Sequence, residues 1–168
     1  MTIIQERWEK IKTLPLKHGA HNEDSEFCVM EAAAFVAGEK WTDRPKSVPP
    51  TIAALFRCWN DSLPTDADRD RLLKPFIPRV IGLSCDKATE TRRAVMAGDF
   101  VLRTVIPEWL RLVKRDDLAD QLAQKPEFTT LAELEKAARA DLAALADLAA
   151  HLEVAQSALV ERMIECKA

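Results

Sequence analysis

The chain has 168 residues, of which 48% are hydrophobic and 30% are charged, and its formal net charge is −3. These proportions are typical of a folded globular domain and exclude a disordered or fibrous chain. The near-neutral total also argues against a general nucleic-acid binder, which needs a strong excess of positive charge.

Apolar residues at helical spacing predict a first helix over residues 4–14, which Pro15 ends. A second helix is expected after a cap at Asp24 or Ser25, and Gly38 ends it. This second helix is apolar on nearly every side, so we expect it at the centre of the core.

Two further helices are predicted over residues 50–61 and 65–73. The first opens on consecutive prolines, which suit a first helical turn, and the second opens on a threonine with capping spacing. Beyond them, Pro75 and Pro78 must break or kink the chain.

A long helix is expected over residues 86–106, and Pro107 should then open a separate short helix. One more helix is predicted over residues 116–124.

The last predicted helix begins at a capping box formed by Thr130 and Glu133 and meets no proline or glycine afterwards. Its apolar residues follow a heptad, as in coiled coils. The leucines and alanines of this pattern are Leu131, Leu134, Ala138, Leu145, Leu148, Leu152, Ala155 and Leu159. We therefore predict a helical body over residues 1–128, a long amphipathic helix over 129–168, and a homodimer through Leu134, Leu145, Leu148, Leu152 and Leu159.

No segment alternates apolar and polar residues as a half-buried strand does, so the predicted fold class is all-α. No stretch approaches the roughly 20 apolar residues that a membrane span needs, and the charged N-terminus does not resemble a secretory signal. The four cysteines form no C-x-x-C pair. A reduced, cytoplasmic protein is therefore expected.

Glu31 is the first candidate functional residue. It lies four positions from both Phe27 and Phe35, so its carboxylate is expected on their buried stripe. A buried charge needs an ionic partner, hydrogen bonds or a metal, and we expect an arginine from residues 57–103. Two roles stay open: a structural ion pair or loop cap, and a ligand or general base.

His18, His21, Cys28 and Glu31 form the one run of side chains that could bind a metal. Zinc accepts nitrogen, sulfur and oxygen ligands, but this spacing matches no established zinc motif. The alternative is that the two histidines belong to a loop that caps the next helix.

Basic residues gather in the middle of the chain, where residues 67–115 hold eleven Lys or Arg and six Asp or Glu. The arginines that could contact an anion or nucleic acid are Arg69, Arg71, Arg79, Arg92 and Arg93. Because carboxylates stand close by in sequence, ordinary solvated helix faces are the favoured interpretation.

Four short stretches carry a resemblance: Cys28–Ala32, Phe35–Glu39, Trp59–Asp61 and Leu72–Pro75. Through them, residues 18–112 resemble a family of helical proteins from bacteria and their phages for which no activity is established. The resemblance implies a phage or mobile-element setting, in which small helical proteins often act by binding another protein. It does not reach the predicted C-terminal helix.

The sequence has no glycine-rich phosphate loop and no nucleophile elbow, and Cys85 has no histidine near it in sequence. We therefore expect no catalytic centre and no cofactor. The favoured function is a non-enzymatic protein that binds another protein, such as a host defence component. Two alternatives are kept: a metal-dependent enzyme that uses Glu31 with His18 or His21, and a nucleic-acid binder that uses residues 67–115.

Overall fold

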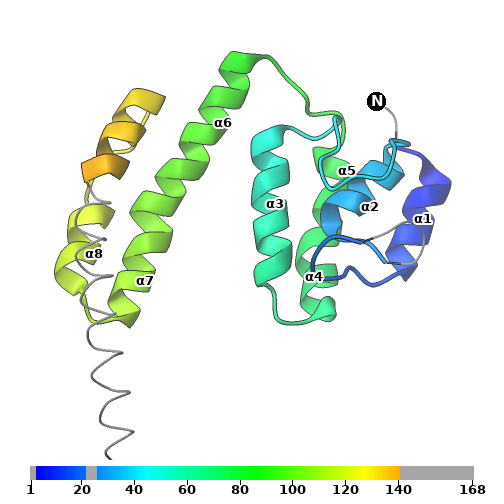
Figure 1. Cartoon of the computed structure of the whole chain (residues 1–168), viewed down its shortest axis with the longest axis horizontal. Coiled ribbons are helices and arrows are strands. Elements are labelled where there is room, and N and C mark those ends of the chain that lie inside the picture. Colours follow the sequence, from blue (N-terminus) through cyan, green and yellow to red (C-terminus); the bar gives the residue numbers. More distant parts are fainter. Residues whose placement is uncertain (1–2, 22–25, 141–168) are drawn as a thin grey trace, which may run out of the picture. The chain divides into compact units, whose positions relative to one another are not determined.

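The computed structural model describes residues 3–21 and 26–140, and these form an all-α protein, as the sequence predicts (Figure 1). The only β pairing in this part of the chain is an isolated bridge between Leu16 and Phe27. None of the helices in these ranges is long and apolar enough to cross a membrane.

The chain divides into two compact units, Met1–Ala97 and Gly98–Ala168. The predicted boundary between residues 128 and 129 falls inside the second unit. Helical residues 131–140 belong to the second unit, and the predicted continuation of this helix over 141–168 lies outside the described residues.

The first unit contains six helical elements and the beginning of a seventh. They are α1 (Gln5–Thr13), α2 (Val29–Val36), α3 (Pro50–Ser62), α4 (Asp66–Leu73), a 3₁₀ turn (Lys74–Phe76), α5 (Ile77–Val80) and the start of α6 (Lys87–Phe100). The predicted kink at Pro75 and Pro78 is the succession of the 3₁₀ turn and the four-residue α5.

Helix α2 is the centre of this unit, as its composition predicts, and it packs against α1, α3 and α5 (Figure 1). Seven of its eight residues are buried. Full burial of one large apolar side chain contributes about 1.5–3 kcal/mol, and α2 buries three such side chains, Val29, Met30 and Val36.

Gly38 ends α2, as predicted, with a Schellman motif. Its N–H donates to Phe35 O (3.1 Å), and the N–H of Glu39 donates to Ala34 O (2.9 Å). Gly38 has φ +76°, a left-handed conformation that glycine adopts without steric cost. A Cβ there would also lie 2.9 Å from Ile4 Cδ1.

The second unit contains the end of α6, a π-helical turn (Val101–Val105), α7 (Ile106–Leu112), α8 (Asp116–Ala123) and residues 131–140. Leu110, Ala119 and Leu122 form its buried core. Leu134 lies against Gly98, which ties residues 131–140 to α6 within this unit.

The break predicted at Pro107 does not occur. Helix α6 continues through the π turn into α7, and Ile106 N–H donates to Val101 O, five residues back. Proline has no N–H and its ring clashes with the carbonyl four residues earlier. The wider π turn immediately before Pro107 is consistent with relief of that clash, so the helix passes through the proline.

Candidate functional site

Glu31 is buried, as predicted, with a side chain 2% exposed. Its Oε1 accepts the N–H of His21 (2.8 Å), and its Oε2 accepts the N–H of Cys28 (2.8 Å). The ring nitrogen Nδ1 of His21 lies 3.0 Å from the same Oε2. The prediction that an arginine pairs with Glu31 is therefore wrong, because His21 and two backbone N–H groups hold this carboxylate.

This arrangement is a capping box at the start of α2. The Cys28 sulfur accepts the N–H of Glu31 (3.5 Å), while Glu31 accepts from Cys28 in return. The helix thus begins at Val29, after a cap at Cys28, and not at the predicted cap, Asp24 or Ser25, which lies outside the described residues. The loop-capping role of Glu31 is the one that the contacts support.

The four predicted metal ligands do not assemble into one site. His21, Cys28 and Glu31 meet in the capping box, whereas His18 interacts electrostatically with Asp61. Burial raises the pKa of the Cys28 thiol to about 12, and a protonated thiol is a poor metal ligand. Within residues 3–21 and 26–140, no three His, Cys, Asp or Glu side chains group as metal ligands.

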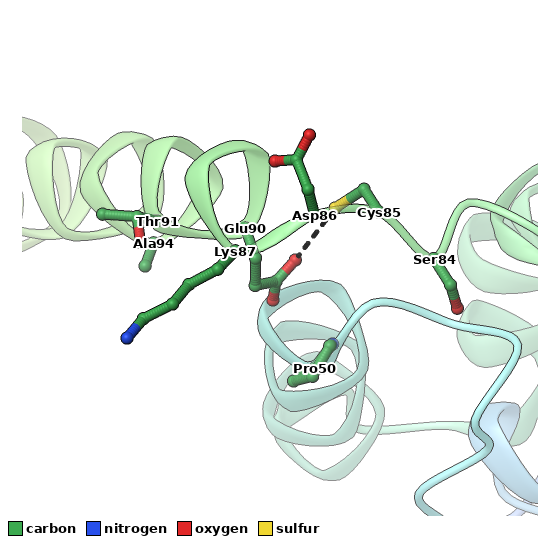
Figure 2. Close-up of a pocket in the computed structure, with 8 residues that line it drawn as sticks. All are labelled: Pro50, Ser84, Cys85, Asp86, Lys87, Glu90, Thr91 and Ala94. Atoms are coloured by element: carbon green, nitrogen blue, oxygen red, sulfur yellow. Dashed lines mark hydrogen bonds between the residues drawn. The ribbon is translucent and has the colours of Figure 1, made fainter.

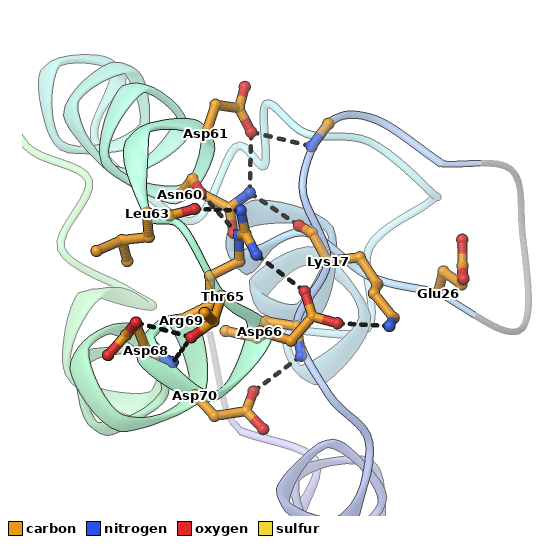
Figure 3. Close-up of polar contacts among 12 residues, drawn as sticks. Lys17, Glu26, Asn60, Asp61, Leu63, Thr65, Asp66, Asp68, Arg69 and Asp70 are labelled. Atoms are coloured by element: carbon orange, nitrogen blue, oxygen red, sulfur yellow. Dashed lines mark hydrogen bonds and ion pairs between the residues drawn. The ribbon is translucent and has the colours of Figure 1, made fainter.

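Asn60, which no sequence pattern indicated, and Arg69, predicted as an anion contact, form a buried polar connection (Figure 3). The Asn60 amide accepts the N–H of Val29 (3.2 Å) and donates to Lys17 O (2.9 Å). Arg69 Nε donates to Asn60 O (2.8 Å), and Nη1 donates to Asp66 (2.9 Å). This network joins α2, α3, α4 and the loop at Lys17, so its role is structural.

The arginines proposed as anion contacts are largely occupied by neighbouring groups. Arg69 is buried in the network just described, Arg71 pairs with Asp68 at 3.0 Å, and Arg93 lies 3.5 Å from Glu90. Arg92 donates to a threonine hydroxyl, and Arg79 stacks over the Phe76 ring. This finding agrees with the interpretation as ordinary helix faces.

An open cavity of about 440 Å³ lies where α6 begins, and Cys85 and Glu90 line it (Figure 2). Cys85 Sγ lies 3.9 Å from Glu90 Oε2 and 2.9 Å from Arg93 Nη1. The Thr51 N–H donates to Glu90 Oε1 (2.6 Å), and the contacts of Glu90 with Thr51, first with its side chain and then with this N–H, lower the pKa of Glu90. A carboxylate with a lowered pKa is a weak base, so these groups do not form a thiol–base pair.

The second unit presents a row of large apolar side chains to solvent. Phe100 is 55% exposed, Trp109 is 45% exposed and Leu112 is 80% exposed, and two valines lie in the same stretch. The members of this apolar row are Phe100, Val101, Val105, Trp109 and Leu112. Contiguous apolar patches larger than a few hundred Å² are uncommon on monomeric proteins and mark interaction sites, so this row is the candidate interaction surface of the second unit.

The π turn is what brings this row onto one face. Phe100 and Trp109 are nine positions apart, about two and a half turns of a regular α-helix, which would place them on opposite faces. The turn at Val101–Val105 contains one residue more than an α-helical turn. Phe100 and Trp109 are therefore about two helical turns apart and lie on the same face. Helix periodicity alone could not reveal this row in the sequence.

Of the predicted heptad, the structure describes Leu131, Leu134 and Ala138. Leu131 is 44% exposed, whereas Leu134 is half-buried against Gly98 of its own unit. The remaining members, Leu145, Leu148, Leu152, Ala155 and Leu159, lie outside the described residues.

No family model matches this chain, and no curated protein and no solved structure is similar to it at a significant level.

Proposed function

We propose that the chain is a non-enzymatic protein-interaction protein that binds its partner through the apolar row. The observation that carries this proposal is the simultaneous exposure of Phe100, Trp109 and Leu112 on one helical face. Trp and Phe are frequent anchors of protein interfaces because each buries a large area with little loss of conformational freedom.

The geometry of the row favours one kind of partner. The row is formed by one helical segment, and such a segment binds by inserting its apolar face into a groove lined by apolar side chains. Two ion pairs flank it, Asp99–Arg103 and Glu108–Arg111, so the surrounding surface carries both signs of charge. We therefore propose a partner protein with an apolar groove.

The resemblance to proteins of bacteria and their phages makes a bacterial host protein the proposed partner. The enzyme alternative gains no support from the capping role of Glu31, and the nucleic-acid alternative gains none from the paired arginines. The proposed homodimer through the predicted C-terminal helix is a separate contact and is tested separately.

The test compares capture from a bacterial lysate by the full chain and by a Trp109→Ala, Leu112→Ala variant. Leu55→Ala is the matched control, because Leu55 is 49% exposed in the first unit. We expect one host protein to be retained by the parent and the control and lost with the double variant. The purified protein should then bind the parent at least tenfold more tightly than the double variant.

Equal binding of that protein to the double variant would overturn the proposal. So would a lysate in which no protein distinguishes the parent from the double variant. Circular dichroism of both variants checks that the fold is retained, which we expect because the altered side chains are exposed.

A further inference from the structure

A second open cavity lies in the first unit, between the loop before α3 and the face of α3 that carries Ala53 and Arg57. Its volume is about 460 Å³, within the range of small-molecule sites. The residues that line it are Arg44, Pro45, Lys46, Val48, Pro50, Ala53 and Arg57. Three of these are cations, and none is a carboxylate.

In the described part of the chain, two of the cations make no ion pair, although Lys46 interacts electrostatically with Glu39. Arg44 and Lys46 are exposed, and within the described residues neither side chain makes a hydrogen bond or an ion pair. Most other arginines in this part of the chain are paired, as Arg69, Arg71 and Arg103 are. An unpaired guanidinium beside a cavity can bind a carboxylate or phosphate through two parallel hydrogen bonds.

The nearest carboxylates are already engaged. Arg57 Nη1 donates to Asp43 O (3.1 Å), and its Nε lies 3.6 Å from Asp43 Oδ2. Glu39 accepts the backbone N–H groups of Lys46 and Ser47, both at 2.7 Å. With Asp43 beside Arg57 and Glu39 near Lys46, the three cations leave an excess of one positive charge at the cavity, and Arg57 is held in place by Asp43.

The other lining residues are apolar, and Val48 and Ala53 are buried. A cavity with a buried apolar wall and exposed cations matches a ligand that has both an apolar body and an anionic group. An apolar ligand would leave the cations without a partner, and a bare anion would leave the apolar wall without a contact.

We propose that this cavity binds a small organic anion, a carboxylate or phosphate joined to an apolar group. Arg44 and Lys46 bind the anionic group, Arg57 supports it from α3, and Val48 and Ala53 contact the apolar body. This site is in the first unit and is independent of the apolar row.

The test is a titration of the full chain, followed by amide NMR, with phenyl phosphate and with phenylacetate. The two compounds distinguish a phosphate site from a carboxylate site. We expect at least one of them to shift the amide signals of Val48 and Ala53, and inorganic phosphate and benzyl alcohol to bind at least tenfold more weakly. Arg44→Gln combined with Lys46→Gln should weaken binding at least tenfold, whereas the control Arg71→Gln should not.

Absence of shifts at Val48 and Ala53 with both compounds would overturn the proposal, as would unchanged affinity in the Arg44→Gln, Lys46→Gln variant. Shifts confined to residues 100–112 would also overturn it, because they would mean binding to the apolar row. If the double variant is unstable, the single variant Arg44→Gln is titrated in its place. Thermal unfolding first checks that this variant is as stable as the parent.

Discussion

Leu134 fills the space that a side chain at Gly98 would need. A Cβ at position 98 would lie 3.2 Å from Leu134 Cδ1 and closer still to its Cδ2. Gly98 is inside a helix, where alanine is ordinarily more stable than glycine by about 1 kcal/mol. The contact should reverse that preference.

We therefore predict that Gly98→Ala destabilises the second unit, measured as faster amide hydrogen exchange in α7 and α8. In a Leu134→Ala background, the same substitution should instead stabilise the unit by about 0.5–1 kcal/mol, because the obstructing side chain is gone. If Gly98→Ala is stabilising in both backgrounds, residues 131–140 do not pack on α6 in solution.

Glu31→Ala should destabilise the first unit by about 2–3 kcal/mol. The substitution leaves the buried Cys28 N–H and the His21 N–H without their acceptor, and a stranded buried donor costs about 1–3 kcal/mol. Urea unfolding followed by tryptophan fluorescence measures the loss.

Glu31→Gln is the matched control, because its amide oxygen can still accept one of the two N–H groups. It should lose about half as much stability as Glu31→Ala. A Glu31→Ala protein as stable as the parent would show that this capping box contributes nothing.

Asp99 should make the second unit sensitive to acid. Arg103 contacts its carboxylate through Nε (2.7 Å) and Nη2 (2.8 Å), and the Phe128 N–H donates to it (2.9 Å). The Arg103 contacts hold the pKa of Asp99 below its ordinary value of 3.8. A carboxyl group with a lowered folded pKa contributes stability above its unfolded pKa, and this stability is lost as the pH falls through the folded pKa.

We expect the thermal midpoint of the parent to fall more steeply below about pH 4 than that of Asp99→Asn. At neutral pH the variant should be less stable by about 1 kcal/mol, because the ionic contact is lost. Parallel pH profiles for the two proteins would contradict this assignment.

Four of the five residues of the predicted homodimer contact, Leu145, Leu148, Leu152 and Leu159, lie outside the residues that the structure describes. Leu145→Asp combined with Leu152→Asp should convert a dimer into a folded monomer, because a charge at a heptad core position opposes pairing. Light scattering after gel filtration gives the mass. A parent that is already monomeric would refute the prediction, and the capture experiment with the apolar row would be unaffected.

Local sequence signals predicted several elements correctly. Pro50 begins α3, Thr65 caps α4 by accepting the Asp68 N–H (3.1 Å), and Gly38 ends α2. Each of these depends on the chemistry of a few neighbouring residues, so it can be read without knowledge of the tertiary fold.

The errors occurred where distant residues decide the outcome. The partner of Glu31 comes from a loop ten positions earlier, and Asn60 reaches across 31 positions to Val29. No periodic pattern identifies such partners. The two candidate sites have the same origin: the cavity needs α3 placed beside the loop at Arg44, and the apolar row needs an irregular helix.

The π turn at Val101–Val105 makes the apolar row respond differently to the loss and to the gain of one residue. Loss of one residue from Leu102–Thr104 would leave eight positions between Phe100 and Trp109, about two turns of a regular α-helix, so both rings would stay on one face. Insertion of one residue into the regular helix after the turn would instead rotate Phe100 by about 100° relative to Trp109. The two aromatic rings would then no longer face one groove, although every side chain of the row would still be present.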